Sequence, residues 1–484
     1  MIENIYRHKN GLKHINIIDS DGFSALFVVN TPVFDNSGVA HAVEHMVFRR
    51  SEAFPEVETL FQITSLTEAK INASTFANTT YFHCQSHCPE TFLLAINYLL
   101  NGLFKPTFDG EDLRNEVHNG NDSGVIFREL LGIEQANTKN EKSHKEGNKQ
   151  NDFCYGGMSA TIGTLTLSDL TNFHKQYYQA NNITLVTANA DVERIANLIS
   201  FIPQQSAQYK QERILLNDAN TSSQAFEDKE QHQKKYSSSI KKLIETYQLW
   251  LQDPYYQEID DYQEIDDHQE IDDHQEIEES TEINNLIPPL VNLSNLFTAR
   301  ATVNKLVNNK IKNLVKKAPL PGLFTNLYQQ AKSELITSEA KGLLCFSAVH
   351  DQSNAVWLTK INNADKALAN ITSYIISGYP AFLARRCQGH CYATQALTID
   401  DSNDSTHLVI FSAFDINPTK HLQETPQCLL SLSQDYRFIR NSLPLAKNKY
   451  SHTHFLADNQ LENITDTDIS NYLKTIASGS HPKV

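Results

Sequence analysis

"NSGVAHAVEHMVF", residues 36–48, places two histidines and a glutamate within five positions. On a helix, positions four apart lie on one face, so His41 and His45 can direct their imidazoles at one metal ion. Glu44 flanks that face and can reach a metal-bound water without binding the metal. This His-x-x-Glu-His order is the inverse of the HExxH zinc helix, and it predicts a zinc site with Glu44 as general base.

The helix needs a third ligand from elsewhere in the chain. We expect a helical region over residues 109–135, and its acidic side chains are the candidates. Spacing alone does not choose among them: Glu111, Asp112, Glu116, Asp122, Glu129 and Glu134. The competing interpretation is a surface helix whose histidines are incidental.

Composition limits the class of protein. The 484 residues are 40% hydrophobic and 9% aromatic, which is sufficient for folded cores and predicts two or three domains. The formal charge of −16 is concentrated in one segment, because 14 acidic residues and no Lys or Arg lie between Leu251 and Ile283. No basic stripe indicates nucleic-acid binding.

We expect a cytoplasmic protein without a membrane partner. The first residues, MIENIYRHKNGLKH, lack the apolar segment of a secretory signal. The longest apolar run, residues 91–104, is too short and too polar to span a bilayer. The seven cysteines imply no disulfide framework, and we expect the histidines His83, His87, His118 and His174 to be structural.

Residues 1–203 mix strands and helices without regular βαβ alternation, which predicts an α+β layer. The expected strands are two within 13–31, EAKINAS, TTYFHCQS and NITLVTA. The expected helices are 37–50, 54–66, 90–104, 109–135, one that Ser168 caps and that runs to about Ala180, and DVERIANLI.

Residues 204–335 are polar and lack a convincing core pattern, so we interpret them as a linker or insert that is partly disordered. Within them lies the acidic repeat QEIDDY-QEIDDH-QEIDDH-QEIEES, residues 257–280. Residues 336–484 again have the sequence pattern of a folded domain and predict a second α+β domain. Its expected elements are strands in GLLCFSAV, CYATQALTI and THLVIFSAF and helices in DKALANITSYIIS and near 421–440 and 466–477.

Five segments resemble the pitrilysin/insulinase family of zinc peptidases, specifically its presequence-protease branch. They are TPVFDNSGVAHAVEHMVFRRSEAFP, KINASTFANTTYFHCQS, GVIFRELLG, the segment from Gly156 to Asn182, and RRCQGHCYA. The matches cover about residues 10–200 and 340–484. The resemblance implies two pitrilysin-like domains, each a mostly antiparallel sheet packed with helices, joined by the polar linker.

The resemblance also implies an activity and a site. The family cleaves short unstructured peptides with zinc, which His41, His45 and Glu129 would bind here. The edge strand around Asn72 and Ala73 would pair with the substrate backbone. Two further residues, Arg386 and Tyr392, would orient substrate and stabilise the oxyanion.

The chain departs from the family pattern in length and detail. The presequence branch is about twice as long, and here the middle is replaced by an unrecognised segment. Arg49 and Arg50 stand near a position where glycine is usual. The alternative function is therefore an inactive family member that binds peptides or serves in assembly, and the sequence leaves open whether one chain or a homodimer forms the enclosure.

Overall fold

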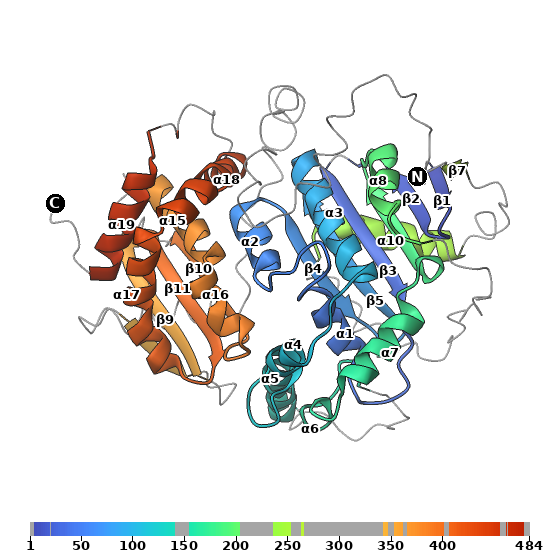
Figure 1. The fold of residues 1–484 in the computed structure, drawn as a ribbon, viewed down its shortest axis with the longest axis horizontal. Coiled ribbons are helices and arrows are strands. Elements are labelled where there is room, and N and C mark those ends of the chain that lie inside the picture. Colours follow the sequence, from blue (N-terminus) through green and yellow to red (C-terminus); the bar gives the residue numbers. More distant parts are fainter. Residues whose placement is uncertain are drawn as a thin grey trace.

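The computed structural model contains two β-sheets, each covered by helices (Figure 1). The residues it describes are 4–19, 21–140, 154–203, 236–252, 263–265, 342–346, 353–361, 365–400, 406–454, 461 and 463–478. The α+β class with mostly antiparallel sheets is confirmed. We call the first sheet with helices α1 to α10 the N-terminal unit, and the second sheet with helices α15 to α19 the C-terminal unit.

The first sheet has seven strands in the order β4-β5-β3-β6-β2-β1-β7. The strands are β1 Asn4–His8, β2 Lys13–Ile17, β3 Phe23–Asn30, β4 Lys70–Thr75, β5 Thr79–Ser86, β6 Ile183–Ala188 and β7 Gln263–Ile265. Neighbours run antiparallel except for the parallel pairs β2–β6 and β1–β7. Strand β4 lies at the edge, with β5 on one side and no strand of the described residues on the other.

Helices and short helical turns connect these strands. They are α1 Val39–Val47, α2 Thr59–Leu66, α3 Pro89–Phe104, α4 Gly110–Asp112, the π-helical segment η1 Leu113–Val117, α5 Val125–Asn140, α6 Ser159–Ile162, α7 Leu167–Tyr177, η3 Ala180–Asn182 and α8 Val192–Ile199. The expected helix over 109–135 is thus three pieces. Thr166 rather than Ser168 caps α7, in a capping box with Asp169.

Strand β3 is buried on both faces, because a second layer covers the face away from α1 and α3. Ala25, Phe27 and Val29 join the main core, whereas Leu26 and Val28 face a separate cluster. That cluster is completed by helix α10, Ser238–Gln252. Alternate residues of a strand point to opposite faces, so the continuous apolar run of β3 fits a strand covered on both sides.

Helix α10 lies within the range that we interpreted as a linker, so that part of the interpretation needs correction. Its apolar residues recur at helical spacing and pack on the sheet: Ile240, Leu243, Ile244, Tyr247 and Trp250. Strand β7 comes from the acidic repeat and pairs with Tyr6–His8 of β1. The rest of residues 204–335 and the domain boundary at 335/336 lie outside the described residues.

The second sheet has four antiparallel strands in the order β10-β11-β9-β8. They are β8 Gly342–Phe346, β9 Ser353–Ile361, β10 Ala393–Asp400 and β11 Thr406–Asp415. The helices are α15 Lys366–Gly378, α16 Pro380–Cys387, α17 Pro418–Gln434, α18 Tyr436–His454 and α19 Asp466–Ser478. Strand β9 and helix α16 were not expected, and the helix near 421–440 is two helices, α17 and α18.

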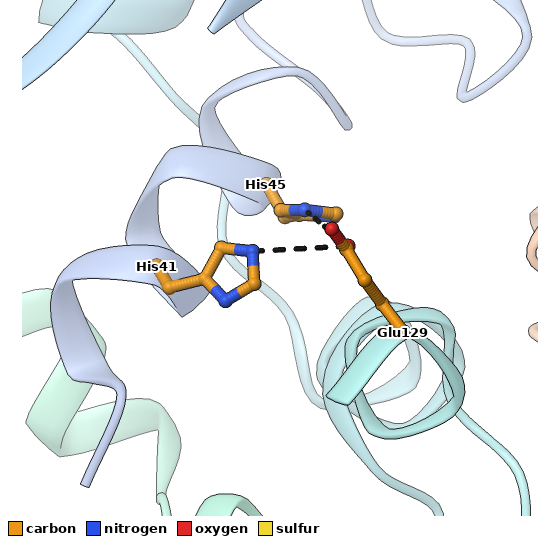
Figure 2. Close-up of side chains that lie close together, drawn as sticks. All are labelled: His41, His45 and Glu129. Atoms are coloured by element: carbon orange, nitrogen blue, oxygen red, sulfur yellow. Dashed lines mark ion pairs between the residues drawn. The ribbon is translucent and has the colours of Figure 1, made fainter. Parts of the chain in front are cut away.

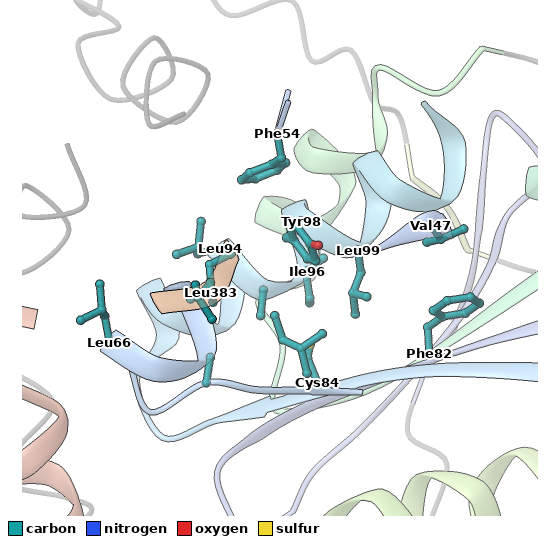
Figure 3. Packing of buried hydrophobic residues seen from close by; sticks show 14 of the residues in the cluster. Val47, Phe54, Leu66, Phe82, Cys84, Leu94, Ile96, Tyr98, Leu99 and Leu383 are labelled. Atoms are coloured by element: carbon teal, nitrogen blue, oxygen red, sulfur yellow. The ribbon is translucent and has the colours of Figure 1, made fainter. Parts of the chain in front are cut away.

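The two units share one apolar core, in which α15 packs against α2. Figure 3 shows Leu383 of α16 beside Leu66 of α2 and Leu94 of α3. Polar contacts flank this core: the Lys449 ammonium donates to the carbonyls of Thr64 and Ser65, at 2.7 and 2.9 Å. No helix among the described residues is long and apolar enough to cross a membrane.

Candidate metal centre

Helix α1 is fixed in the core before any ligand is considered. It begins after Gly38, which adopts a left-handed conformation with φ 75°. Ala42, Val43 and Met46 are fully buried and anchor one side of the helix. His41 and His45 project from its other side, with their rings 4.8 Å apart edge to face.

The structure brings Glu129 of α5 to these two histidines (Figure 2). Glu129 Oε2 lies 3.9 Å from His41 Nε2 and 3.7 Å from His45 Nε2. One ligand atom from each of the three residues lies within 4.8 Å of the others, and no second group of this kind occurs in the part of the chain that the structure describes. Zinc bonds of about 2.0 Å in tetrahedral geometry separate ligand atoms by about 3.3 Å, so the observed spacing is close to that of a zinc site.

Both imidazoles are oriented by a hydrogen bond at the other nitrogen. His41 Nδ1 lies 2.9 Å from the carbonyl oxygen of Gly156, and His45 Nδ1 lies 2.9 Å from Glu116 Oε1. Because these partners can only accept, each Nδ1 carries the proton and each Nε2 presents its lone pair toward Glu129. Metal-binding histidines are oriented by such contacts, and the donor set of two imidazoles and a carboxylate fits zinc.

Two glycine-containing turns hold the Gly156 carbonyl in place. Gly157 has φ 86°, and a Cβ there would lie 2.7 Å from Gly38 Cα, so only glycine allows the turns to meet. Asn36 fixes the same contact, because its side-chain oxygen accepts from the Cys154 amide and its carbonyl from the Thr161 hydroxyl. The start of α1 and the partner of His41 are therefore positioned together.

Glu44 is buried beside the two histidines. Burial raises the pKa of this carboxyl, although the two neighbouring histidines and a hydrogen bond from Thr75 oppose the shift. Thr75 Oγ1 donates to Glu44 Oε2 at 2.5 Å. The carboxylate thus has a defined orientation in a poorly solvated place, which suits a general base.

The structure places Arg386 on Glu116. Its Nη1 and Nη2 donate to the two carboxylate oxygens of Glu116, both at 2.9 Å, and its guanidinium lies over the ring of Phe61. Glu116 is 3% exposed and also accepts from Arg49 at 3.2 Å. Burial would raise the pKa of Glu116, but the Arg386 charge, His45 and Arg49 hold it well below its usual value.

The other residues that the sequence singled out fall in two places. Tyr392 lies close enough to Glu129 for that carboxylate, together with burial, to raise the pKa of the phenol. Asn72 and Ala73 lie on the edge strand β4, where the Asn72 side chain accepts from the Ala73 amide at 2.9 Å.

Four contacts of the site were not predicted: the carboxylate of Glu116 on His45, the carbonyl of Gly156 on His41, the hydroxyl of Thr75 on Glu44, and Arg49 on Glu116. Glu116 was a candidate ligand and instead accepts a hydrogen bond from His45. The two adjacent arginines after α1 were the available signal, since buried arginines require carboxylate partners. Arg49 and Arg50 both pair with Asp112.

Sequence comparison relates the part of the chain around α1 to a family of peptidases. The sequence model of "Insulinase (Peptidase family M16)" matches residues 34–127, which include α1 and reach into α5. A mitochondrial presequence protease of Danio rerio is 28% identical over 182 residues, 34% of this chain and 18% of its own. An uncharacterised protein of Saccharomyces cerevisiae is 28% identical over 191 residues, 37% of this chain and 18% of its own.

The fold and the site together define an α+β chain with a candidate metal centre on a peptidase-type helix. Residues 34–127 match the insulinase family model, in agreement with the resemblance to the insulinase/pitrilysin family that the sequence showed. The chain spans about a fifth of the length of these two curated relatives. A solved protease structure from Helicobacter pylori aligns with 98% of this chain and 96% of its own, at a TM-score of 0.31 and 10% identity.

Proposed function

We propose that this protein is a zinc-dependent metalloendopeptidase. The observation that carries the proposal is the convergence of His41 Nε2, His45 Nε2 and Glu129 Oε2, with both Nδ1 atoms already engaged by acceptors. Zinc held by these side chains would act as a Lewis acid that polarises a peptide carbonyl and lowers the pKa of water beside it.

Glu44 has the role of general base. Thr75 holds Oε2 of its carboxylate, so Oε1 is the atom that would take a proton from the attacking water. As the oxygen of that water bonds to the carbonyl carbon and the peptide C–N bond breaks, Glu44 would return the proton to the leaving nitrogen. The Tyr392 hydroxyl, whose pKa the Glu129 charge raises, is a candidate to donate to the developing oxyanion.

Short unstructured peptides are the substrate class that the site favours. The edge strand β4 has one free side among the described residues and ends at Thr75, which contacts Glu44. A peptide added as a further strand would satisfy its backbone hydrogen bonds along β4 and pass the base at the end of that strand. A folded segment could not offer a free strand for this pairing.

The test is zinc content together with cleavage of a quenched peptide library. We expect about one zinc per chain and cleavage that chelators abolish. Glu44→Gln should retain zinc and lose cleavage by at least about a hundredfold, the usual scale of general-base catalysis. Glu111→Gln, which changes an exposed carboxylate on α4, is the control and should cleave like the unchanged protein.

Two results would contradict the proposal. A purified chain that binds no zinc would rule out the metal centre. A chain that binds zinc and peptides but cleaves none of the library would support the alternative, an inactive family member that binds peptides or serves in assembly.

A further inference from the structure

The metal centre of the N-terminal unit is contacted by a turn of the C-terminal unit. We define this turn as residues 386–389, at the end of α16. Arg386 donates two hydrogen bonds to Glu116, as described above, and the Cys387 carbonyl accepts from Arg49 Nη2 at 2.9 Å. The Gly389 carbonyl accepts from Ser123 Oγ at 2.7 Å. The turn therefore closes around the segment that carries Glu116.

The approach of the two backbones is closer than any side chain would permit. Gly389 has φ 72°, and a Cβ at this position would lie 2.2 Å from the carbonyl oxygen of Asn115. Asn115 and Glu116 belong to the π-helical segment η1, a geometry often found at functional sites. Gly389 is thus required for the turn to dock beside Glu116.

Three side chains donate hydrogen bonds to the buried carboxylate of Glu116: His45, Arg49 and Arg386. His45 Nδ1 and Arg386 Nη2 both lie 2.9 Å from the same oxygen, Oε1. The second oxygen, Oε2, receives Arg386 Nη1 and Arg49 Nη1. A bidentate arginine fixes the plane of a carboxylate, so the guanidinium of Arg386 determines where Oε1 meets His45.

We propose that Arg386 is a positioning residue for the metal ligand His45, acting through Glu116, so that zinc affinity depends on docking of the C-terminal unit. This inference rests on the zinc site of the proposed function. It differs from the substrate-orienting role that the family resemblance implies, because the guanidinium lies on Glu116, the partner of His45.

The experiment measures zinc affinity by competition with a chromophoric chelator. Arg386→Met should weaken zinc binding about 10- to 100-fold, the scale observed when the outer partner of a metal ligand is lost. Arg385→Met is the matched control: Arg385 is the adjacent residue of α16, and it forms an equally buried ion pair with Asp415 at 2.6 Å. The control should change zinc affinity less than about threefold.

A second pair of variants separates positioning from loss of folding. Glu116→Gln keeps an oxygen for His45 and leaves no buried anion unpaired when Arg386 is removed. Adding Arg386→Met to Glu116→Gln should therefore change zinc affinity less than about threefold, because the two side chains act as one unit. Gly389→Ala, which leaves both partners of the ion pair intact, should weaken zinc binding as Arg386→Met does.

The outcomes are distinct from those of the proposed function. Zinc binding by the unchanged protein, with equal affinity in Arg386→Met, would overturn this inference alone. Equal losses in Arg385→Met and Arg386→Met, or an undiminished effect of Arg386→Met in the Glu116→Gln background, would also overturn it. Absence of zinc binding in the unchanged protein would overturn both proposals.

Discussion

The hydroxyl of Thr75 donates to the carboxylate of Glu44 at 2.5 Å, which joins the end of the edge strand β4 to helix α1. Two further hydroxyl groups support Thr75. Thr75 Oγ1 lies 3.4 Å from Thr80 Oγ1, and Thr80 Oγ1 lies 2.8 Å from Thr31 Oγ1. The strand that would hold a peptide and the base that would act on it are thus coupled through one side chain.

We predict that Thr75→Val lowers kcat for peptide cleavage about tenfold, equivalent to about 1.4 kcal/mol of transition-state stabilisation. The methyl group keeps the shape of the side chain but cannot hold Glu44 Oε2. Thr75→Ser retains the hydroxyl and should cleave close to normally. Zinc affinity should be unchanged in both variants. Unchanged cleavage in Thr75→Val would contradict the prediction, because this variant lacks only the hydroxyl that donates to Glu44.

The edge of β4 supplies a second prediction. Proline removes a backbone donor but is tolerated at a sheet edge. We expect Ala73→Pro to raise KM about tenfold or more, because the Ala73 amide can no longer pair with an added strand. Folding should be preserved and zinc should remain bound. An unchanged KM with correct folding would exclude strand addition at this residue.

Removing the metal should abolish cleavage without unfolding the chain. Helix α1 is anchored by apolar residues that are fully buried, including Val43 and Met46, and these contacts do not require zinc. The circular dichroism spectrum should therefore persist in chelator, and activity should return when zinc is added. Zinc at a thousandfold excess over its Kd should stabilise the fold by only about 4 kcal/mol, measured as an increase in Tm. Complete unfolding on chelation would instead identify a structural zinc site.

The pair of histidines on helix α1 could be predicted from the sequence, whereas the contacts that orient these candidate ligands could not. Helical spacing alone places His41 and His45 on one face. The sequence spacing left six acidic candidates, and only the tertiary fold brings Glu129 to the histidines while Glu116 reaches behind one of them. Both carboxylates are glutamates on one stretch of chain, so residue type does not distinguish their roles. Glu116 lies on the π-helical segment η1, which sequence periodicity does not reveal.

The second layer on the sheet was missed for a related reason. Helix α10 lies in the polar region that also contains the acidic repeat. Its apolar stripe from Ile240 to Trp250 is short compared with the length of polar sequence around it. The indication was present elsewhere, in the unbroken apolar run of β3 from Ala25 to Val29. Such a run needs cover on both faces, and the linker interpretation left one face open.

Two partly buried histidines, His83 and His174, give the last prediction: the free energy of unfolding decreases as the pH falls below 6.5. Burial lowers the pKa of His83 to about 4 and that of His174 to about 4, from an ordinary value of 6.5. Both are therefore neutral in the fold between these pH values, whereas the unfolded chain gains their protons. Because the unfolded state binds more protons in this window, the free energy of unfolding decreases as pH falls from 6.5 to 4.

The contribution of one histidine can be measured in a variant. A difference of one bound proton gives the free energy of unfolding a slope of about 1.4 kcal/mol per pH unit. Two histidines therefore give a slope of up to about 2.7 kcal/mol per pH unit near pH 5. In denaturant unfolding, His174→Gln should reduce the slope near pH 5 by about one proton and leave it unchanged at pH 8. Lys175→Gln alters the exposed neighbour on α7 and should have no effect on the slope. Equal slopes in His174→Gln and the unchanged protein would mean that His174 is solvated enough to titrate normally, because only a buried neutral imidazole produces this difference.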